Sequence, residues 1–234
     1  MTEELFREDA YLKECDATVV AINDLGGIIL DRTIFYPTGG GQPGDGGKIG
    51  DVDIATTVYD RETGEIVHVP SEGQDLPDVG TTVKITLDWD RRYLHMRMHT
   101  GLHLLCASVP CGVTGGQIRT VKSRLDFDVG ELKLDKEEIT EQINTLMEGH
   151  HDVTASWITD AEMDANPELV RTMSVQPPRK GGRVRLLKVG DDVDLQPCGG
   201  THVTNTSEIG TLRVSKIENK GKRNRRVNIV FDEG

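Results

Sequence analysis

The stretch DRRYLHMRMHTGLHLLCASV, residues 90–109, separates two parts of the sequence that differ in character. Its apolar residues recur at the spacing of one helix face, which predicts an amphipathic helix. They are Leu94, Met98, Leu102 and Leu105. We expect Asp90 to cap the start of this helix, and Pro110 follows its end. Because turns and β-branched residues dominate before the helix, we place a domain boundary between residues 89 and 90.

The first part, residues 16–88, predicts β-structure. ATVVAIN (residues 17–23) and GGIILD (residues 26–31) are β-branched runs around a turn, as in a hairpin, and TVKITLDW (residues 82–89) alternates like a strand. FYPTGGGQPGDGG (residues 35–47) is too rich in glycine for the interior of an element. Several short strands separated by turns indicate a small β-barrel or a sandwich.

The part after the first helix mixes strands with helices, which indicates an α+β domain. Its clearest helix is DKEEITEQINTLMEG (residues 135–149), with Asp135 as the cap and Gly149 at the end. The expected strands are SRLDFDV (residues 123–129), HDVTASWI (residues 151–158), GRVRLLKV (residues 182–189) and a terminal hairpin over residues 210–232.

Composition limits the class of protein. The 234 residues carry a formal net charge of −12, which argues against non-specific binding of nucleic acid, because Lys and Arg supply that affinity. No apolar run reaches the roughly 20 residues of a membrane helix, and the acidic N-terminus does not resemble a signal peptide. Four cysteines without a disulfide-framework spacing are expected to stay reduced. We therefore expect a cytoplasmic protein without a membrane partner, and the oligomeric state stays open.

Two basic stretches stand out in this acidic chain. KIENKGKRNRR (residues 216–226) and RKGGRVRLLK (residues 179–188) are each either a solvated hairpin tip or a local contact with nucleic acid. The candidate tRNA contacts are Lys220, Lys222, Arg223 and Arg225.

Histidines and one cysteine indicate a metal site. His95, His99 and His103 recur every four residues on the first helix, so neighbouring members lie roughly 5–6 Å apart on one face. This spacing alone leaves open which pair binds metal, or whether all three are ordinary surface histidines. PCGGTH (residues 197–202) adds Cys198 and His202. Nitrogen and sulfur ligands from a helix and a distant loop are typical of zinc, rather than of magnesium or calcium.

Two well-known classes of zinc enzyme do not fit. A metalloprotease helix has a glutamate directly after its first histidine, and Thr100 stands there after His99. A zinc deaminase has His-x-Glu together with Pro-Cys-x-x-Cys, and Pro197-Cys198 lacks both the second cysteine and the glutamate.

Three motifs in one order carry a resemblance to a known family. FYPTGGGQPGD (residues 35–45), HTGLHLL (residues 99–105) and CGGTHV (residues 198–203) are similar to the editing domain of alanyl-tRNA synthetase and to the AlaX-type alanyl-tRNA editing proteins of medium length. The resemblance runs from about residue 19 to the final strand. It implies an N-terminal β-barrel over residues 1–89. An α+β, zinc-binding editing domain of the threonyl/alanyl-tRNA synthetase second-domain type would follow over residues 90–234.

The resemblance also implies roles for individual residues. The zinc ligands would be His99, His103, Cys198 and His202, which leaves His95 as a neighbour or core residue. Gln117, within TGGQIRTVKSRLDFDV (residues 114–129), would lie in the catalytic site. The implied substrate-binding residues are Thr33, Gly40, Gly41, Gln42, Gly199 and Thr201.

The reaction that the resemblance implies is hydrolysis of the ester that joins a wrong amino acid, serine or sometimes glycine, to tRNA(Ala). Four protein ligands would make a closed zinc site, whereas a catalytic zinc usually keeps one position open. Either one ligand is loose and the zinc activates water, or the zinc orients the substrate and Gln117 or backbone amides hold the water. The alternatives are a zinc-stabilised RNA-binding module without catalysis and a hydrolase for another aminoacyl-tRNA.

Thr33, just before the glycine-rich segment, is a candidate reader of the wrong amino acid. Alanine fits wherever serine fits, so size alone cannot spare the correct ester. A polar group left unpaired by alanine costs about 1–3 kcal/mol and can discriminate. Thr33 has a suitable hydroxyl, although it could equally be an ordinary strand residue.

Overall fold

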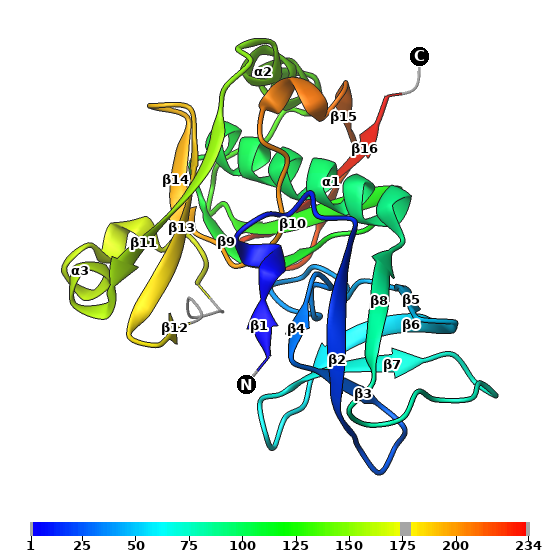
Figure 1. Ribbon diagram of the computed structural model, residues 1–234. Coiled ribbons are helices and arrows are strands. Elements are labelled where there is room, and N and C mark those ends of the chain that lie inside the picture. Colours follow the sequence, from blue (N-terminus) through cyan, green and yellow to red (C-terminus); the bar gives the residue numbers. More distant parts are fainter. Residues whose placement is uncertain (1, 174–178, 233–234) are drawn as a thin grey trace. The chain divides into compact units, whose positions relative to one another are not determined.

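The structure is a computed structural model that describes residues 2–173 and 179–232. The chain forms two compact units, Met1–Leu94 and His95–Gly234, and the helix α1 (Trp89–Ser108) runs through the point of division. Strands and helices follow one another as Figure 1 shows. The expected α+β class, with a small barrel in the first part, is confirmed. The domain boundary after residue 89 stays a prediction; it coincides with the first residue of α1.

The first unit is built around a closed barrel with the strand order β2-β3-β7-β6-β5-β8. Its strands are β2 (Glu14–Ile22), β3 (Ile28–Leu30), β5 (Gly47–Ile49), β6 (Val52–Tyr59), β7 (Ile66–Pro70) and β8 (Thr82–Leu87). Beside the barrel, β1 (Glu3–Glu4) pairs in parallel with β4 (Arg32–Thr33), and a short 3₁₀ turn, η1 (Leu5–Arg7), follows β1. Apolar side chains such as Val19, Ile28 and Ile85 fill the interior. Closure leaves the barrel without an exposed strand edge.

The glycine-rich segment of residues 35–47 is held against the barrel. A Cβ on Gly44 would lie 1.9 Å from the carbonyl oxygen of Thr57, so only glycine fits at this position. The carboxylate of Asp45 accepts a hydrogen bond from Nε of Arg92 at 2.8 Å, and both side chains are buried. Arg92 also donates to the carbonyls of Ala10 and Ile34. Each nitrogen of the Arg92 guanidinium thus has an acceptor, and this buried ion pair holds the segment in one conformation.

The start of α1 differs from the prediction. The helix begins at Trp89, and the carboxylate of Asp88 accepts from the amide of Arg91 at 3.2 Å, so Asp88 caps it. The prediction of Asp90 as the cap is wrong. Asp88 and Asp90 are both suitable caps, but β8 ends at Leu87, so Asp88 is the residue that directly precedes the helix. For the helix α2 (Lys136–Glu148) the predicted cap, Asp135, is confirmed, and its side chain accepts from the amide of Glu138.

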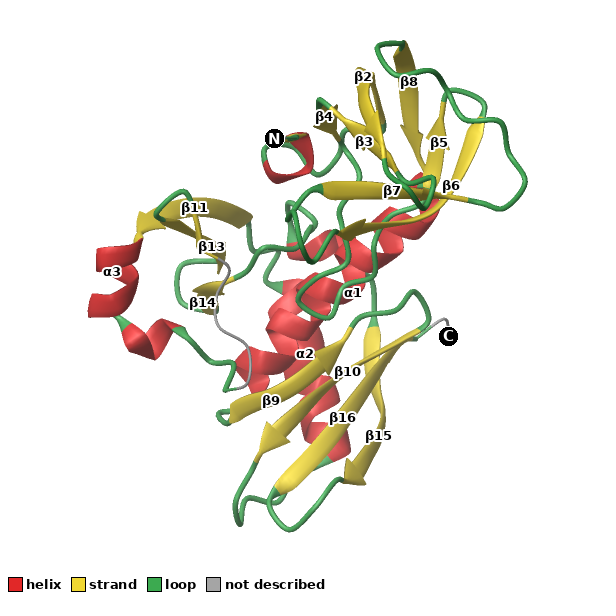
Figure 2. Cartoon of the chain, turned by 90° about the horizontal axis from the view of Figure 1, so that it is seen from below, coloured by secondary structure: helices red, strands yellow, loops and turns green. Residues whose placement is uncertain are grey.

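The second unit contains two sheets and three helices among its described residues. The first sheet has the order β15-β16-β10-β9, and α1 and α2 lie on one of its faces (Figure 2). Its strands are β9 (Gly112–Gln117), β10 (Lys122–Asp128), β15 (Leu212–Asn219) and β16 (Asn224–Phe231). Gly101 allows the close approach of α1, since a Cβ there would lie 2.6 Å from Cδ1 of Leu212. The predicted terminal hairpin is β15 with β16.

The second sheet places the cysteine motif. The central strand β13 (Arg183–Val189) pairs with β11 (Val153–Thr159) on one side, and with β12 (Arg179–Lys180) and β14 (Asp194–Pro197) on the other. The helix α3 (Asp160–Ala165) and the 3₁₀ turn η2 (Pro167–Leu169) follow β11. The 3₁₀ turn η3 (Thr206–Glu208) precedes β15. All four strands of this sheet are antiparallel to their neighbours.

A histidine is buried inside the first unit and bound to Thr33. His68 is fully buried, and its Nδ1 lies 2.9 Å from the carbonyl oxygen of Ile28, so Nδ1 carries the proton. The Thr33 hydroxyl therefore donates to Nε2 of His68 at 2.8 Å, while it accepts from the amide of Phe35 at 3.0 Å. Burial lowers the pKa of His68 from 6.5 to about 4, despite the bond to Ile28.

This histidine predicts a pH dependence of stability. Below pH 6.5 the unfolded chain takes up a proton that the folded His68 refuses until about pH 4. Stability from this group is therefore complete above pH 6.5 and is lost as the pH falls through that window. Between pH 7 and pH 5 the loss is about 2 kcal/mol. Urea unfolding of the wild type and of His68→Gln at both pH values measures it. An equal loss in both proteins would exclude His68 as the source.

Candidate metal centre

Four of the side chains singled out in the sequence converge in the second unit. His99 and His103 lie one turn apart on α1, Cys198 directly follows β14, and His202 lies in the loop before η3. One ligand atom from each of the four lies within 4.8 Å of every other. Sγ of Cys198 is 3.2 Å from Nε2 of His202 and 3.5 Å from Nε2 of His99. His95, which is also buried, lies outside this group of described residues.

Hydrogen bonds fix which nitrogen of two imidazoles faces the cluster. The Thr100 hydroxyl donates to the carbonyl of Met96, so it must accept from Nδ1–H of His202, which is 3.2 Å away. Nδ1–H of His103 donates to Oδ2 of Asp194 at 2.7 Å. In the neutral form of either ring, Nε2 is then the nitrogen without a proton, and it faces the cluster.

Asp194 is a site residue that the sequence analysis missed. Its carboxylate is almost fully buried and also accepts from Nε2 of Gln196 at 2.8 Å. A carboxylate behind a histidine ligand fixes the tautomer and the ring orientation. A signal was present in the sequence, because Asp194, Gln196 and Cys198 alternate and the side chains of a strand alternate between its faces.

Arg185 supports the loop that carries the cysteine. Its Nη1 donates to the carbonyl of Cys198 at 2.9 Å and to that of Gly200 at 3.1 Å. Arg185 lies on β13, and its own carbonyl accepts from the amide of Cys198, so the pairing of β13 with β14 continues to the cysteine. No short-range pattern in the sequence indicates this contact.

The electrostatics of the cluster favour a thiolate at Cys198, a neutral imidazole at His202 and a protonated imidazole at His103. Burial raises the pKa of Cys198, but His99 and His202 lower it more, and the result lies well below the ordinary thiol range. Burial, together with the neighbouring His99, holds the pKa of His202 well below 6.5. Burial lowers the pKa of His103, yet the hydrogen bond to Asp194 outweighs this and raises it to about 10. Metal binding at this cluster would accordingly displace a proton from His103.

The donor set fits a zinc ion. Zinc in proteins is bound tetrahedrally by Cys sulfur and His nitrogen, and the cluster offers one thiolate and three imidazoles. Two of the histidines have their other nitrogen held by Asp194 and by Thr100, as metal-binding histidines usually do. The cluster can therefore hold a metal ion, and the ligand types favour zinc over magnesium or calcium.

The other predicted site residues occupy separate positions. Gln117 ends the edge strand β9, is part-buried and pairs with Arg124. Thr201 is fully buried in the cysteine loop, and Gly199 lies beside it. Thr33 lies on β4, and Gln42 is buried within the glycine-rich segment. Gly40 and Gly41 precede Gln42 and have positive φ angles of 56° and 83°. Their proposed roles stay predictions.

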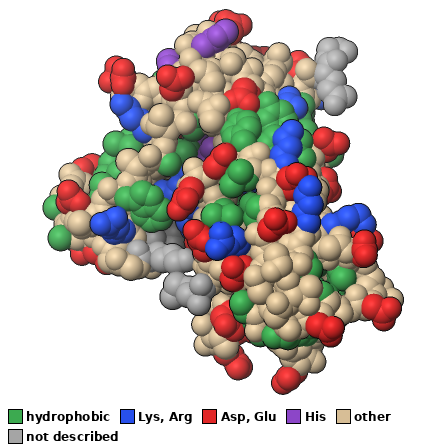
Figure 3. Space-filling view, in the orientation of Figure 1, with side chains coloured by type: hydrophobic (Ala, Val, Ile, Leu, Met, Phe, Trp, Pro, Cys, Tyr) green, Lys and Arg blue, Asp and Glu red, His purple; other side chains and the backbone are tan. Residues whose placement is uncertain are grey.

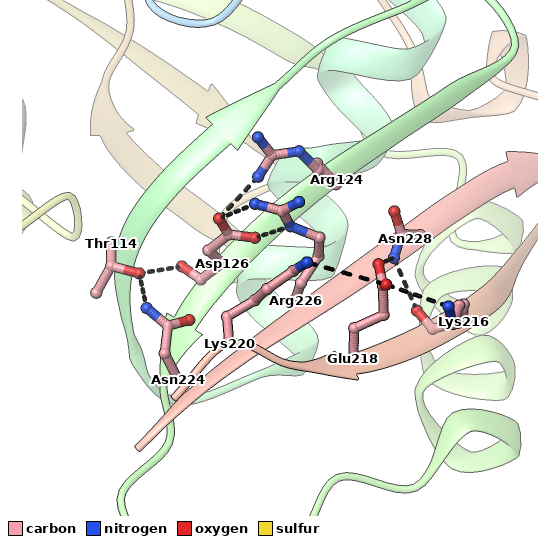
Figure 4. A network of polar contacts seen from close by, with 9 residues as sticks. All are labelled: Thr114, Arg124, Asp126, Lys216, Glu218, Lys220, Asn224, Arg226 and Asn228. Atoms are coloured by element: carbon pink, nitrogen blue, oxygen red, sulfur yellow. Dashed lines mark hydrogen bonds and ion pairs between the residues drawn. The ribbon is translucent and has the colours of Figure 1, made fainter. Parts of the chain in front are cut away.

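The basic turn between β15 and β16 is partly neutralised by carboxylates. Lys220 lies 4.0 Å from Glu218, and Arg226 donates to Asp126 (Figure 4). Arg223 donates to both carboxylate oxygens of Asp128, at 2.9 and 3.2 Å. More generally, acidic and basic side chains alternate over the face shown in Figure 3. Of the four candidate tRNA contacts, Lys222 and Arg225 are those for which the structure describes no carboxylate partner.

Comparison with known proteins agrees with this geometry. Residues 184–228, which include the cysteine motif, match the family "Threonyl and Alanyl tRNA synthetase second additional domain". Residues 8–91 match "tRNA synthetases class II (A)". The chain is 35% identical over 240 residues to an alanyl-tRNA editing protein, AlaX-M, of Methanosarcina mazei, which covers 97% of this chain and 95% of that protein. The chain belongs to the alanyl-tRNA editing protein family.

Other relatives extend the comparison. The AlaX-M protein of Methanosarcina barkeri is 36% identical over 239 residues, covering 97% of this chain and 98% of the relative. An alanine–tRNA ligase of Pyrobaculum arsenaticum is 35% identical over 230 residues, which are 93% of this chain but 25% of the ligase. The family resemblance predicted from the three motifs is confirmed. Among the described helices, none combines the length and the apolar composition needed to cross a membrane.

Asp194 yields a prediction about metal affinity. Asp194→Asn keeps the size of the side chain but removes the charge that orients His103, so zinc should bind roughly 10–100-fold more weakly. Competition with a chromophoric chelator measures the dissociation constant. Asp191→Asn is the matched control, because Asp191 lies on the turn between the same two strands and is exposed. Equal affinities of Asp194→Asn and the control would contradict the role of Asp194.

Proposed function

We propose that this protein is a trans-editing hydrolase, which removes a wrong amino acid, chiefly serine and also glycine, from tRNA(Ala). The observation that carries the proposal is the convergence of His99, His103, Cys198 and His202 within 4.8 Å, in a chain related over nearly its whole length to alanyl-tRNA editing proteins. tRNA(Ala) is the partner, and the cytoplasm, where tRNA is charged, is the proposed location.

We assign one zinc ion to these four side chains. A zinc ion held there would supply Lewis-acid chemistry next to an ester that its adjacent ammonium group already activates. The other residues of the site would position these ligands and the loop that carries two of them. Asp194 and Thr100 hold two imidazoles in one tautomer, and Arg185 holds the carbonyls of Cys198 and Gly200. A rigid loop of this kind is what accurate placement of a substrate ester requires.

Gln117 is proposed to hold the water that attacks the ester. Its carboxamide both donates and accepts, so it can bind a water molecule and aim one of its lone pairs. Its place at the end of an edge strand, part-buried, leaves the side chain access to a small molecule.

Thr33 is proposed to read the serine hydroxyl. The structure adds a condition to this idea, because the Thr33 proton is already donated to His68. The Thr33 oxygen can still accept, so the serine hydroxyl would be the donor in such an interaction.

Lys222 and Arg225 are proposed to bind phosphates of the tRNA. Replacing both with alanine should flatten the salt dependence of tRNA binding, by roughly one unit of slope for each phosphate that is no longer neutralised. Titration of tRNA at several salt concentrations measures the slope. A slope equal to that of the wild type would show that this turn does not touch the tRNA.

Two variants separate metal binding from catalysis. Cys198→Ala removes the thiolate, and we expect zinc content and deacylation of Ser-tRNA(Ala) to fall together. Gln117→Ala should keep about one zinc per chain and still slow deacylation. The assays compare Ser-, Gly- and Ala-tRNA(Ala) side by side, with metal analysis of each protein. Full activity of Cys198→Ala would refute the zinc-dependent hydrolase, and binding of tRNA without any deacylation by the wild type would favour an RNA-binding module.

Substrate selectivity tests Thr33. Thr33→Val keeps the shape and removes the hydroxyl, so hydrolysis of Ser-tRNA(Ala) should slow and the Ser/Ala rate ratio should fall roughly tenfold, about 1.4 kcal/mol. His68→Gln, which changes the partner of Thr33 and leaves the hydroxyl in place, is the comparison variant. If the ratio of a folded, zinc-loaded Thr33→Val equals that of the wild type, Thr33 does not read serine.

A further inference from the structure

Three side chains, those of Cys198, Arg185 and Trp157, form a row across the second sheet, on the face that carries the candidate metal centre. Asp194 and Gln196 on β14 point to His103, and Cys198, directly after β14, continues their alternation. The amide of Cys198 donates to the carbonyl of Arg185, which places Arg185 beside the cysteine on β13. Arg185 in turn pairs with Trp157 on β11. Directly paired residues share a face of the sheet, so Cys198, Arg185 and Trp157 lie side by side on it.

Trp157 is unusual among these neighbours because it is exposed. Its exposed fraction is 44%, whereas Arg185 is 9% exposed and Leu187, next to Arg185 on the same face, is buried. Ala155, two residues earlier on the same face of β11, is exposed as well. A large flat ring beside a methyl group thus forms an open ledge at the edge of the sheet. A tryptophan is rarely left in this state without a partner, since its burial is worth much free energy.

The distance from this ledge to the metal centre matches one nucleoside. Neighbouring strands lie about 4.8 Å apart, so Trp157, two strands from Cys198, lies roughly 10 Å away. In the substrate class proposed above, the scissile ester is attached to the ribose of the 3′-terminal adenosine. With the ester at the metal centre, the adenine base lies away from the metal by about the combined length of the ribose and the base. The distance from the ester to the base is therefore comparable with the separation between the metal centre and the ledge.

We propose that Trp157 is a stacking platform for the terminal adenine of the aminoacylated RNA. This proposal rests on the proposed function, and it adds which residue contacts the terminal base of that substrate. Aromatic side chains bind single-stranded bases by stacking on their faces, without hydrogen-bond readout. Exposed Arg183, on the same face of β13 two residues from Arg185, adds positive charge beside the ledge, as a phosphodiester strand requires. The platform would hold the ester in register with the four metal ligands.

The test is a double-mutant cycle, in which the affinity is measured after a change in the protein, after a change in the RNA, and after both changes. The probe is an RNA hairpin without an attached amino acid, which copies the acceptor stem of tRNA(Ala) and ends in single-stranded ACCA. Its twin lacks only the terminal base. Trp157→Ala should weaken binding of the complete hairpin roughly tenfold. Binding of the abasic twin should stay unchanged, and Trp157→Phe should restore most of the affinity. An equal weakening with both hairpins, or no weakening with either, would overturn the platform.

The chain offers a matched control and an internal reporter. Leu195 is exposed to nearly the same fraction, 43%, but lies one residue from Asp194 and so on the opposite face of the same sheet. Leu195→Ala should bind both hairpins as the wild type does. The sequence has two tryptophans, so Trp89→Phe leaves Trp157 as the sole tryptophan, which is excited selectively at wavelengths that tyrosine does not absorb. The complete hairpin should quench its fluorescence, and the abasic twin should not.

Failure of the platform and failure of the proposed reaction give different results. If the wild type deacylates mischarged tRNA(Ala) while the cycle shows no coupling, the platform is wrong and the reaction stands. If the cycle shows coupling while no mischarged tRNA is hydrolysed, the base contact is right and the reaction is wrong.

Discussion

The backbone pairing between Cys198 and Arg185 is the constraint on which the candidate site depends. It carries the ladder of β13 and β14 past Pro197, so that Asp194, Gln196 and Cys198 stay on one face of the sheet. A slip of one residue would turn all three side chains away. Asp194 would then lose His103, and Cys198 would leave the two other histidines. The register of a single strand pair thus decides whether the thiolate of Cys198 joins the three histidines.

A second constraint acts through α1. Gly101, between His99 and His103, permits the close approach of α1 to the first sheet at Leu212, which fixes the position of the helix that carries both histidines. Buried polar groups then complete the arrangement. Thr100 and Asp194 each satisfy the outer nitrogen of one imidazole, so the cost of burying these groups is offset by hydrogen bonds. The cluster is thus held by groups that are not members of it.

Much of this could be predicted because the signals were local. The helices over residues 90–109 and 135–149 follow from apolar spacing and caps, and the four ligands follow from i, i+4 spacing and a family motif. What could not be predicted depends on long-range pairing. Arg185 and Trp157 became neighbours of Cys198 only through the strand order β11-β13-β14, which no short pattern encodes. The predicted helix cap was wrong because Asp88 and Asp90 are both suitable caps. The end of the barrel strand β8 determines which of the two precedes the helix.

The burial of His68 links the stability of the first unit to the orientation of the Thr33 hydroxyl. Its ring keeps the Thr33 hydroxyl in a defined direction, at the cost of a histidine that resists protonation. Such an arrangement lowers the stability of the protein at low pH and leaves it unchanged near neutrality.

The central claim is that His99, His103, Cys198 and His202 hold one zinc ion together. X-ray absorption spectroscopy of the zinc-loaded protein tests it most directly, because sulfur and nitrogen ligands differ in distance and scattering. The account predicts one sulfur at about 2.3 Å and three nitrogens at about 2.0–2.1 Å. The sulfur should be absent from the spectrum of Cys198→Ala. A shell of nitrogen and oxygen alone in the wild type would contradict the account.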